Sequence, residues 1–385
     1  MDTKKLLYCV LCYFLLSLLS GQRVVQGHIA PHHHHHHHSH RHHLFKSGGL
    51  SKLFVFGDSY ADTGNTNKSM SSWNDPYGIT FPGKPAGRFS DGRVLTDYVG
   101  YNSVEFESAC SFYRLSSSCA APRTKSMGIR SPIPYRWREL GIPLLIYGMN
   151  FAYGGMGVFP TLNPGPNMTT QIDFFENLIT DNVFNISDLH SSLTLVTLAG
   201  NDYFAYIVNN GTQGLESFIP KVVTQLTVNL KRIHGLGAKK IAVTALQPLG
   251  CLPRSTATSS FQQCDETENS LVNYHNLLLK QAVAKLNNET NDSAFVIVDL
   301  YASFMSVIQN KGEKEGSIKF ENPLKPCCVG ISSNYSCGSV DESGAKKYTL
   351  CEDKESAFFW DSVHPTQEGW LAVYAALQAT LEQLF

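Results

Sequence analysis

The chain has 385 residues, 43% of them hydrophobic, and a formal net charge of -1 at pH 7. This length allows one large domain or two small ones, and the composition is typical of a globular protein with a sizeable core. A net charge so close to zero provides no electrostatic footprint for nucleic acid or for acidic lipid. We therefore expect no nucleic-acid partner and no substrate that is attracted over long distances by charge.

The first residues have the pattern of a secretory signal peptide. Residues 4–5 are basic, residues 6–19 are apolar, and residues 20–21 are small. Cleavage is expected there or near Gly27, and we assign residues 1–27 to the signal. The apolar run is short for a bilayer span, which favours a cleaved signal over an uncleaved anchor. No later segment is long and apolar enough to span a membrane, so we expect secretion to the extracellular space or the cell wall.

Histidine is concentrated in the segment that follows. Of the 15 histidines, 11 lie between His28 and His43. We assign residues 28–50 to a His-rich disordered linker. The tract could bind transition metals as a disordered cluster, or it could be a solvated linker without a function, which we favour. Ser39 and Arg41 interrupt the run, which argues against an engineered tag.

Strand and helix patterns alternate along the rest of the chain. Short apolar runs predict buried strands at residues 53–56, 193–198, 241–246 and 295–298. Between and after them, apolar residues repeat at helical spacing over residues 219–233, 271–286 and 370–381, and we interpret these stripes as the core faces of helices. Such alternation is typical of a mainly parallel sheet with helices on both faces.

A serine follows the first predicted strand at a position that suits a nucleophile. The apolar run stops at Gly57 and Ser59 comes two residues later, where the chain turns toward a helix. Near the other end of the chain, Asp361 and His364 supply a carboxylate and an imidazole three residues apart. A serine hydroxyl needs a base to take its proton, and the base needs a group that orients it. Together these residues predict a nucleophilic serine site.

The choice of base is narrow because only four histidines lie outside the tract. His234 belongs to the charged last turn of a predicted helix, His275 lies inside a helical pattern, and His190 lies in a polar stretch. His364 differs from them in having an acidic residue at short spacing and a helix-breaking proline directly after it. We take His364 as the general base; a surface loop histidine is the alternative.

These and other motifs resemble the plant-type GDSL esterases/lipases of the SGNH hydrolase superfamily. Gly57-Asp58-Ser59 is similar to the first block of that family, with Tyr60 where the family name has Leu. The resemblance covers about residues 53–385, and four blocks occur in the family's order. The other similar segments are residues 150–157, 197–203 and 361–364, together with the signatures at residues 87–93 and 247–253.

The resemblance implies a fold and a set of roles. It implies one SGNH-hydrolase-like three-layer α/β/α domain over residues 51–385, with a mainly parallel central sheet. The sequence contains no metal, nucleotide or flavin fingerprint, so we expect no cofactor and no metal. The resemblance also implies that Ser59 is the nucleophile, that His364 is the base and that Asp361 orients the base.

An oxyanion hole is implied as well. Its donors would be the backbone N–H of Ser59, a backbone N–H of Gly155 or, as second choice, Gly154, and the side chain of Asn201. A plain turn is the alternative for the glycines, and a helix cap is the alternative for Asn201. Further groups that we expect to hold the Ser59 loop in place are Asp58, Asp62 and Asn65.

One stretch departs from the family pattern. Residues from about 100 to 125 separate Asp97-Tyr98-Val99 from a segment at residues 128–132 that should follow almost directly. The stretch is either a genuine insertion or an artefact such as retained intron sequence. We favour the artefact. A disulfide between Cys110 and Cys119, which lie in it, is therefore in doubt.

Cysteine usage agrees with export. Eight cysteines lie beyond the predicted signal, none at the paired Cys-x-x-Cys spacing of a zinc site. In an oxidising compartment their even number predicts disulfides, and the local bridge that we favour joins Cys251 to Cys264. A second group comprises Cys327, Cys328, Cys337 and Cys351. We expect the first two of these to pair with the last two, in an order that the sequence leaves open.

Seven Asn-x-Ser/Thr sequons predict that at least some asparagines carry glycans. Each sequon is weak evidence alone, because the pattern is common by chance. Their number in an apparently secreted chain favours glycosylation. The seven are Asn67, Asn167, Asn185, Asn210, Asn288, Asn291 and Asn334.

We predict a secreted serine carboxylester hydrolase that cleaves acyl or acetyl esters through an acyl-serine intermediate. The expected partner is a small-molecule or lipid ester, with acetylated wall polysaccharide as a further candidate, and the chain is expected to be a monomer. Two other classes stay open: an acyltransferase that uses the same acyl-enzyme, and a non-catalytic secreted metal-binding or cell-wall protein that uses the histidine tract.

Overall fold

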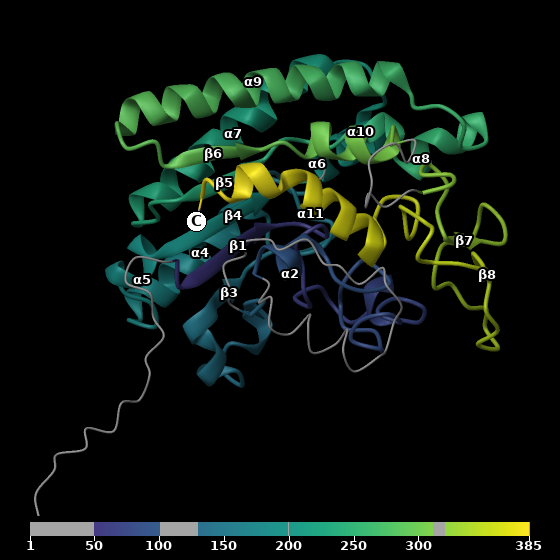
Figure 1. Cartoon of the computed structure of the whole chain (residues 1–385), viewed down its shortest axis with the longest axis horizontal. Helices are drawn as coiled ribbons and strands as arrows, with labels where there is room; N and C mark the ends of the chain where they lie inside the picture. The colour runs from purple at the N-terminus through teal and green to yellow at the C-terminus, as the bar shows by residue number, and fades with distance from the viewer. Residues whose placement is uncertain (1–49, 101–129, 199, 311–319, 385) are drawn as a thin grey trace, which may run out of the picture. The chain divides into compact units, whose positions relative to one another are not determined.

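The computed structural model describes residues 50–100, 130–198, 200–310 and 320–384 (Figure 1). They belong to a compact unit that begins at Lys46 and runs to the end of the chain. The predicted signal, the histidine tract and nearly all of the predicted insertion, with Cys110 and Cys119, lie outside the described residues.

A six-stranded parallel sheet forms the centre of this unit. Its spatial order is β2 (Ile133–Pro134), β3 (Gly148–Asn150), β1 (Lys52–Gly57), β4 (Ser192–Thr197), β5 (Ile241–Thr244) and β6 (Phe295–Val298). The four predicted strands are β1, β4, β5 and β6, and the mainly parallel sheet is confirmed. β2 and β3 are not among the predicted strands, because two or three residues are too few to show an alternating pattern.

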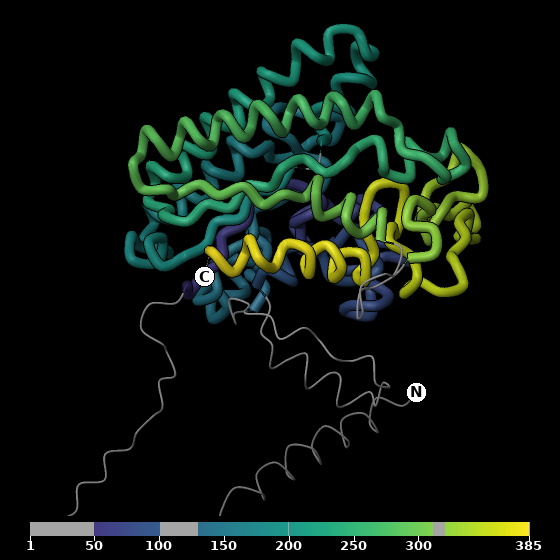
Figure 2. The backbone as a smooth tube through the Cα atoms, turned by 45° about the horizontal axis from the view of Figure 1, so that its top comes forward, coloured from purple at the N-terminus to yellow at the C-terminus, as the bar shows by residue number. Residues whose placement is uncertain are grey.

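Helices cover both faces of the sheet. In one layer, α4 packs against α7 and α7 against α9; in the other, α2 and α10 both pack against α11, and α9 also lies alongside β6 (Figures 1 and 2). The bounds are α4 (Met168–Thr180), α7 (Leu215–Gly235), α9 (Glu266–Thr290), α2 (Leu95–Val99), α10 (Leu300–Ile308) and α11 (Gln367–Leu381). The three predicted helical stripes belong to α7, α9 and α11, and the three-layer α/β/α arrangement is confirmed.

The side chains of β1 alternate between the two helical layers that cover the sheet. Phe54 and Phe56 point to the same face, where their rings lie 4.8 and 5.5 Å from that of Phe175 on α4. Leu53 and Val55 point to the opposite face, because successive strand residues alternate. All four side chains are fully buried, so β1 reads as a continuous apolar run, as expected of a strand that is covered on both faces.

Shorter elements complete the described structure. The remaining helices are α5 (Ile186–His190), α6 (Asn201–Asn210) and α8 (Pro253–Thr256). Short 3-10 helices lie at Ser71–Trp73, Tyr135–Trp137, Ile142–Tyr147, Leu249–Cys251 and Ala257–Ser259.

A small antiparallel sheet of β7 (Cys328–Gly330) and β8 (Tyr348–Leu350) lies at the end of the unit where α11 begins (Figures 1 and 2). Disulfides join Cys327 to Cys351 and Cys328 to Cys337, which settles the order that the sequence left open. The predicted bridge between Cys251 and Cys264 is confirmed.

Candidate active site

Three neighbouring strands bring the sequence blocks to one place. β1 lies between β3 and β4, so the strand order reverses at β1. Ser59 follows β1, Gly155 follows β3 and Asn201 follows β4. The carboxyl ends of parallel strands meet at one edge of the sheet, and open α/β sheets bind ligands where the strand order reverses. The candidate site lies at this edge.

Ser59, His364 and Asp361 form a continuous chain of hydrogen bonds. The Oγ atom of Ser59 lies 2.8 Å from Nε2 of His364, although the two residues are 305 positions apart. Nδ1 of His364 lies 2.9 Å from each carboxylate oxygen of Asp361. With Nδ1 donating to the carboxylate, Nε2 is left as an acceptor for the serine proton.

The carboxylate of Asp361 is buried and strongly hydrogen-bonded. Its Oδ1 accepts the backbone N–H groups of Val363 and His364, each at 2.8 Å, and its Oδ2 accepts the hydroxyl of Tyr77 at 2.8 Å. Burial raises the pKa of Asp361, but the neighbouring His364 and these backbone bonds outweigh burial, and the pKa lies below its ordinary value. Asp361 is therefore a charged acceptor that can orient the imidazole.

Two buried aromatic residues that the sequence analysis did not single out surround this chain of hydrogen bonds. Tyr77 donates to Asp361 from a position 284 residues earlier. The ring of Phe89 stacks on the imidazole of His364, with centroids 5.0 Å apart. Phe89 lies in a segment that resembled a family signature, but no local pattern marks Tyr77.

The backbone donors of the candidate oxyanion hole can now be distinguished. Within the described residues, the N–H groups of Ser59 and Gly155 donate to no other protein group. The N–H of Gly154 is already used, since it donates to Asp62 Oδ2 at 2.9 Å and to Thr66 Oγ1 at 2.8 Å. Of the two glycines, Gly155 is therefore the one with a donor available for substrate.

Gly155 also has a conformational reason to be glycine. Its φ of 80° lies in the left-handed region, which favours a residue without a Cβ. A Cβ at this position would collide with the side chain of Asn163. A larger residue here would force the Asn163 side chain to move and would strain the backbone next to the candidate oxyanion hole.

Asn201 is the first residue of α6, and its amide joins the other two blocks. Its Nδ2 donates to Asp58 Oδ2 at 3.0 Å and to the backbone oxygen of Met156 at 3.1 Å. The N-cap position belongs to Gly200, which has no side chain to cap with, so the helix-cap alternative for Asn201 is wrong. An oxyanion at this site would compete with Met156 for one amide hydrogen.

The next residue, Asp202, was missed from the sequence. Its carboxylate accepts the backbone N–H groups of Val158 at 3.0 Å and Phe159 at 2.9 Å, and so fastens the segment that follows Gly155. Burial raises the pKa of Asp202 to about 6, although these two hydrogen bonds oppose the rise.

Asp62 and Asn65 hold the loop after β1, as the sequence analysis expected. Asp62 Oδ1 accepts the N–H groups of Gly64 at 2.7 Å and Asn65 at 2.6 Å. Asn65 Nδ2 donates to the backbone oxygens of Asn150 and Ala152, at 2.7 and 2.9 Å. The loop after β1 is thereby tied to the loop after β3.

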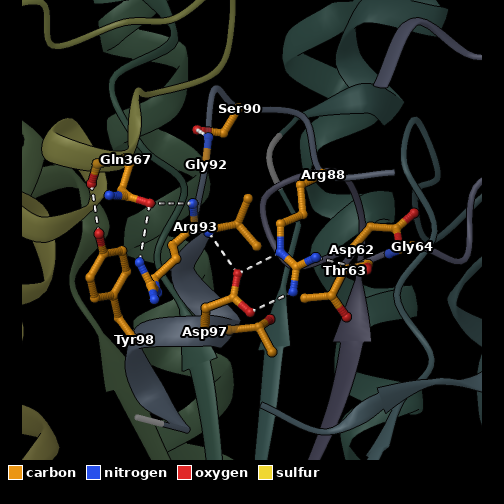
Figure 3. Close-up of polar contacts among 12 residues, drawn as sticks. Asp62, Thr63, Gly64, Arg88, Ser90, Gly92, Arg93, Asp97, Tyr98 and Gln367 are labelled. Atoms are coloured by element: carbon orange, nitrogen blue, oxygen red, sulfur yellow. Dashed lines mark hydrogen bonds and ion pairs between the residues drawn. The ribbon is translucent and has the colours of Figure 1, made fainter. Parts of the chain in front are cut away.

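An ion pair between the partly buried Arg88 and the buried Asp97 braces the same loop from another side. Arg88 donates to both carboxylate oxygens of Asp97 at 2.8 Å, and its Nη1 lies 3.3 Å from the backbone oxygen of Thr63 (Figure 3). The pair belongs to the signature at residues 87–93 and to α2. Because the guanidinium bonds to both oxygens of the carboxylate, the pair holds the two side chains in one relative orientation as well as balancing their charges.

With this geometry in place, the comparisons with known proteins decide the family. The model of the GDSL-like lipase/acylhydrolase family matches residues 53–377. The chain belongs to the GDSL lipase/acylhydrolase family. A GDSL esterase/lipase of Arabidopsis thaliana is 52% identical over 98% of the chain and 97% of its own length. A second from the same plant is 51% identical over 87% of the chain and 89% of its own length.

Solved structures related to this GDSL protein are more distant. A catalytic mutant of an acetylxylan esterase from Geobacillus stearothermophilus has a TM-score of 0.39 at 14% identity, covering 88% of this chain and 95% of that one. An extracellular lipase from Streptomyces rimosus has a TM-score of 0.33 at 11% identity, covering 85% and 99%. The family and its close relatives identify the chain as a carboxylic ester hydrolase of the esterase/lipase type.

Two other histidines of the described chain, His234 and His275, have partners outside the candidate site. His234 Nε2 lies 2.8 Å from Asp292, and His275 Nδ1 lies 2.6 Å from the hydroxyl of Tyr203. Within the described ranges, no three His, Cys, Asp or Glu side chains gather in a way that could hold a metal ion. None of the described helices has both the length and the apolarity to cross a bilayer.

The seven sequons are distributed over the surface. Six of their asparagines are exposed, whereas Asn167 is partly buried and caps α4 with its side chain. The exposed six are Asn67, Asn185, Asn210, Asn288, Asn291 and Asn334. Glycosylation of any of them stays a prediction.

Proposed function

We propose that this GDSL hydrolase is a secreted enzyme that cleaves acyl or acetyl esters, with Ser59 as the nucleophile, His364 as the general base and Asp361 as its partner. The observation that carries the proposal is the hydrogen-bond chain from Ser59 Oγ through both ring nitrogens of His364 to the ionised Asp361. A serine that touches an oriented base at the switch point of an α/β sheet is arranged for nucleophilic attack.

The first half of the reaction forms an acyl-enzyme. Ser59 Oγ attacks the ester carbonyl carbon while Nε2 of His364 takes the hydroxyl proton, and Asp361 stabilises the imidazolium. The negative charge that develops on the carbonyl oxygen would be met by the N–H groups of Ser59 and Gly155 and by the Asn201 amide. Collapse of this intermediate breaks the ester bond, and His364 gives its proton to the departing alcohol.

The second half releases the acid. A water molecule attacks the acyl-Ser59 carbonyl carbon and gives its proton to His364. The second tetrahedral intermediate expels Ser59 Oγ, which regains the proton. The net change is one ester and one water converted to one acid and one alcohol.

Export and the chemical class of the substrate are part of the same proposal. The signal-like start, the disulfides of the described chain and the exposed sequons all support an oxidising, extracellular environment. The substrate is an ester of a small molecule or a lipid, and acetylated wall polysaccharide is a further class to test. Since one chain supplies every residue of the site, we take the enzyme to act as a monomer.

Replacement of the nucleophile tests the proposal. Ser59→Ala should fold and lose esterase activity on a short p-nitrophenyl ester by about 10⁴-fold or more, the usual loss for such a residue. A fluorescent phosphonate should label the wild-type enzyme on Ser59 and fail to label the variant. The matched control is Ser192→Ala, since Ser192 is buried on β4 and its hydroxyl donates to the backbone oxygen of Leu189.

Two outcomes would contradict the assignment: undiminished activity in purified Ser59→Ala, or phosphonate found on another serine of the wild type. Product analysis in the presence of a simple alcohol should give mainly free acid. A dominant new ester would instead favour the acyltransferase alternative.

A further inference from the structure

The residue that follows the nucleophile departs from the family pattern, because Tyr60 stands where the family name has leucine. Its side chain is completely buried. The ring packs against Trp370 of α11, with centroids 4.9 Å apart, and against Phe304 of α10, at 6.2 Å. An apolar side chain such as leucine would also bury its surface here, so burial does not account for the hydroxyl.

The hydroxyl of Tyr60 reaches the loop that carries the base. It donates to the backbone oxygen of Val363 at 2.9 Å, across 303 positions of sequence. Val363 directly precedes His364. Burial, followed by the charge of Asp58, raises the pKa of Tyr60 well above its ordinary value, so the hydroxyl stays protonated and able to donate. This bond joins the residue after the nucleophile to the residue before the base.

The ring of Tyr60 also borders the imidazole itself. It meets His364 edge-on, with centroids 6.0 Å apart and an angle of 65° between the planes, while Phe89 stacks on the imidazole at 5.0 Å. The backbone N–H of Tyr60 donates to Asp58 Oδ1 at 3.1 Å, which fixes the start of the nucleophile loop. Tyr60 therefore contacts both loops whose separation sets the distance from Ser59 to His364.

We propose that Tyr60 is a positioning residue for the ester hydrolysis: its hydroxyl anchors Val363 and thereby holds His364 at hydrogen-bond distance from Ser59. The inference rests on the proposed function and adds a residue to it. Proton transfer from serine to histidine depends steeply on geometry, and small displacements reduce turnover strongly. A fully buried side chain makes no contact with substrate, so its loss should change kcat and leave KM unchanged.

Tyr60→Phe is the sharpest variant, because it removes the hydroxyl and keeps the ring. Tyr98→Phe is its matched control: Tyr98 is also buried, and its hydroxyl donates at 2.9 Å to a backbone oxygen, that of Gln367 in α11 (Figure 3). Both variants lose a hydrogen bond to a backbone oxygen, and Tyr60→Phe also loses the contact of its hydroxyl with Gln247, so both should show a lower melting temperature. Only Tyr60→Phe should lower kcat, by about tenfold.

A second measurement separates an effect on the position of His364 from an effect on substrate binding. The rate at which a small phosphonate modifies Ser59 depends on the same proton transfer, and it should fall in Tyr60→Phe by the same factor as kcat. Tyr60→Leu, which introduces the residue of the family name, should be at least as slow, because it lacks both the hydroxyl and the ring edge.

The results that would overturn the inference are distinct from those that would overturn the proposed function. If wild type is active and Tyr60→Phe matches Tyr98→Phe in kcat and phosphonate rate, the hydroxyl contributes only stability and the inference fails. If wild type neither hydrolyses esters nor reacts with phosphonate at Ser59, the proposed function fails and the inference fails with it.

Discussion

At the scale of single residues, the Asn201 amide holds two loops together, and we predict that it also donates to the oxyanion. Its Nδ2 donates to Asp58 and to the backbone oxygen of Met156. The developing oxyanion would be the stronger acceptor, because it is charged. Release of Met156 in favour of the oxyanion would make the interaction specific to the transition state, which is the condition for raising kcat.

Asn201→Ala should therefore lower kcat by roughly 10²–10³, the usual loss for one oxyanion donor, with little change in KM. Its matched control is Asn287→Ala, because the Asn287 side chain also makes two hydrogen bonds: Nδ2 donates to the backbone oxygen of Phe295, at the start of β6, and Oδ1 accepts the N–H of the same residue. Steady-state kinetics and melting temperatures of both variants separate the effects. A normal kcat in folded Asn201→Ala would remove Asn201 from the oxyanion hole.

Asp202 holds the backbone of Val158 and Phe159, and its carboxylate makes the stability of the protein depend on pH. Its pKa of about 6 in the folded protein lies above the ordinary value of 3.8. The folded state therefore binds more protons than the unfolded state between these values, and the contribution of Asp202 to stability decreases as pH rises from about 4 to about 6. Over the whole interval this amounts to about 3 kcal/mol.

Asp202→Asn should remove this pH dependence. The difference in free energy of unfolding, variant minus wild type, should become more favourable to the variant as pH rises from 4 to 6, and should level off above that. Denaturant titrations of both proteins across this pH range measure the difference directly. A difference that stays constant with pH would show that Asp202 has an ordinary pKa.

At the scale of elements, the β7–β8 sheet supports the loop that carries Asp361. The backbone N–H of Cys328 donates to the oxygen of Trp360 at 2.7 Å, and that of Cys327 donates to Phe359 at 2.9 Å. Tyr77, the donor to Asp361, packs in the same small apolar cluster as these cysteines and Trp360. The disulfides therefore constrain the backbone immediately before Asp361.

Removal of one bridge tests this support. Cys328→Ser/Cys337→Ser should lower stability by about 2–3 kcal/mol, the value expected for so short a loop. Because the bridge also holds Trp360, kcat should fall several-fold even far below the melting temperature. Thermal unfolding and kinetics at low temperature distinguish lost stability from lost geometry, and an unchanged kcat in the folded variant would confine the bridge to stability.

At the scale of the whole molecule, every group placed in the site belongs to the unit that begins at Lys46. Ser59, Gly155 and Asn201 lie at three strand ends, and Asp361 and His364 lie between the β7–β8 sheet and α11. The parallel sheet is what brings these distant segments together, because the carboxyl ends of its strands share one edge.

An enzyme that begins at Lys46 should therefore have the same kcat and KM as one that begins at His28. Metal binding, measured by titration with Zn²⁺ or Ni²⁺, should be lost with residues 28–43 if the tract binds metal at all. A change in ester kinetics on removal of these residues would give the histidine tract a part in catalysis and contradict this expectation.

The sequence by itself determined the strands that are long enough to show an apolar pattern, the helices with a full stripe, and the family. It also singled out Ser59, Asp361 and His364, because nucleophilic catalysis needs those residue types and the motifs around them are specific. Their catalytic roles stay predictions, although the structure brings the three within hydrogen-bond distance.

Only the tertiary structure decided which of two adjacent glycines has a free donor, which cysteines pair, and that Tyr77 and Asp202 support the site. Gly154 and Gly155 look alike in sequence, and they differ because Asp62 and Thr66, from another loop, occupy the N–H of Gly154 alone. Such contacts join residues that are far apart in the chain. Local periodicity carries no record of them, since they depend on the path of the backbone between the two partners.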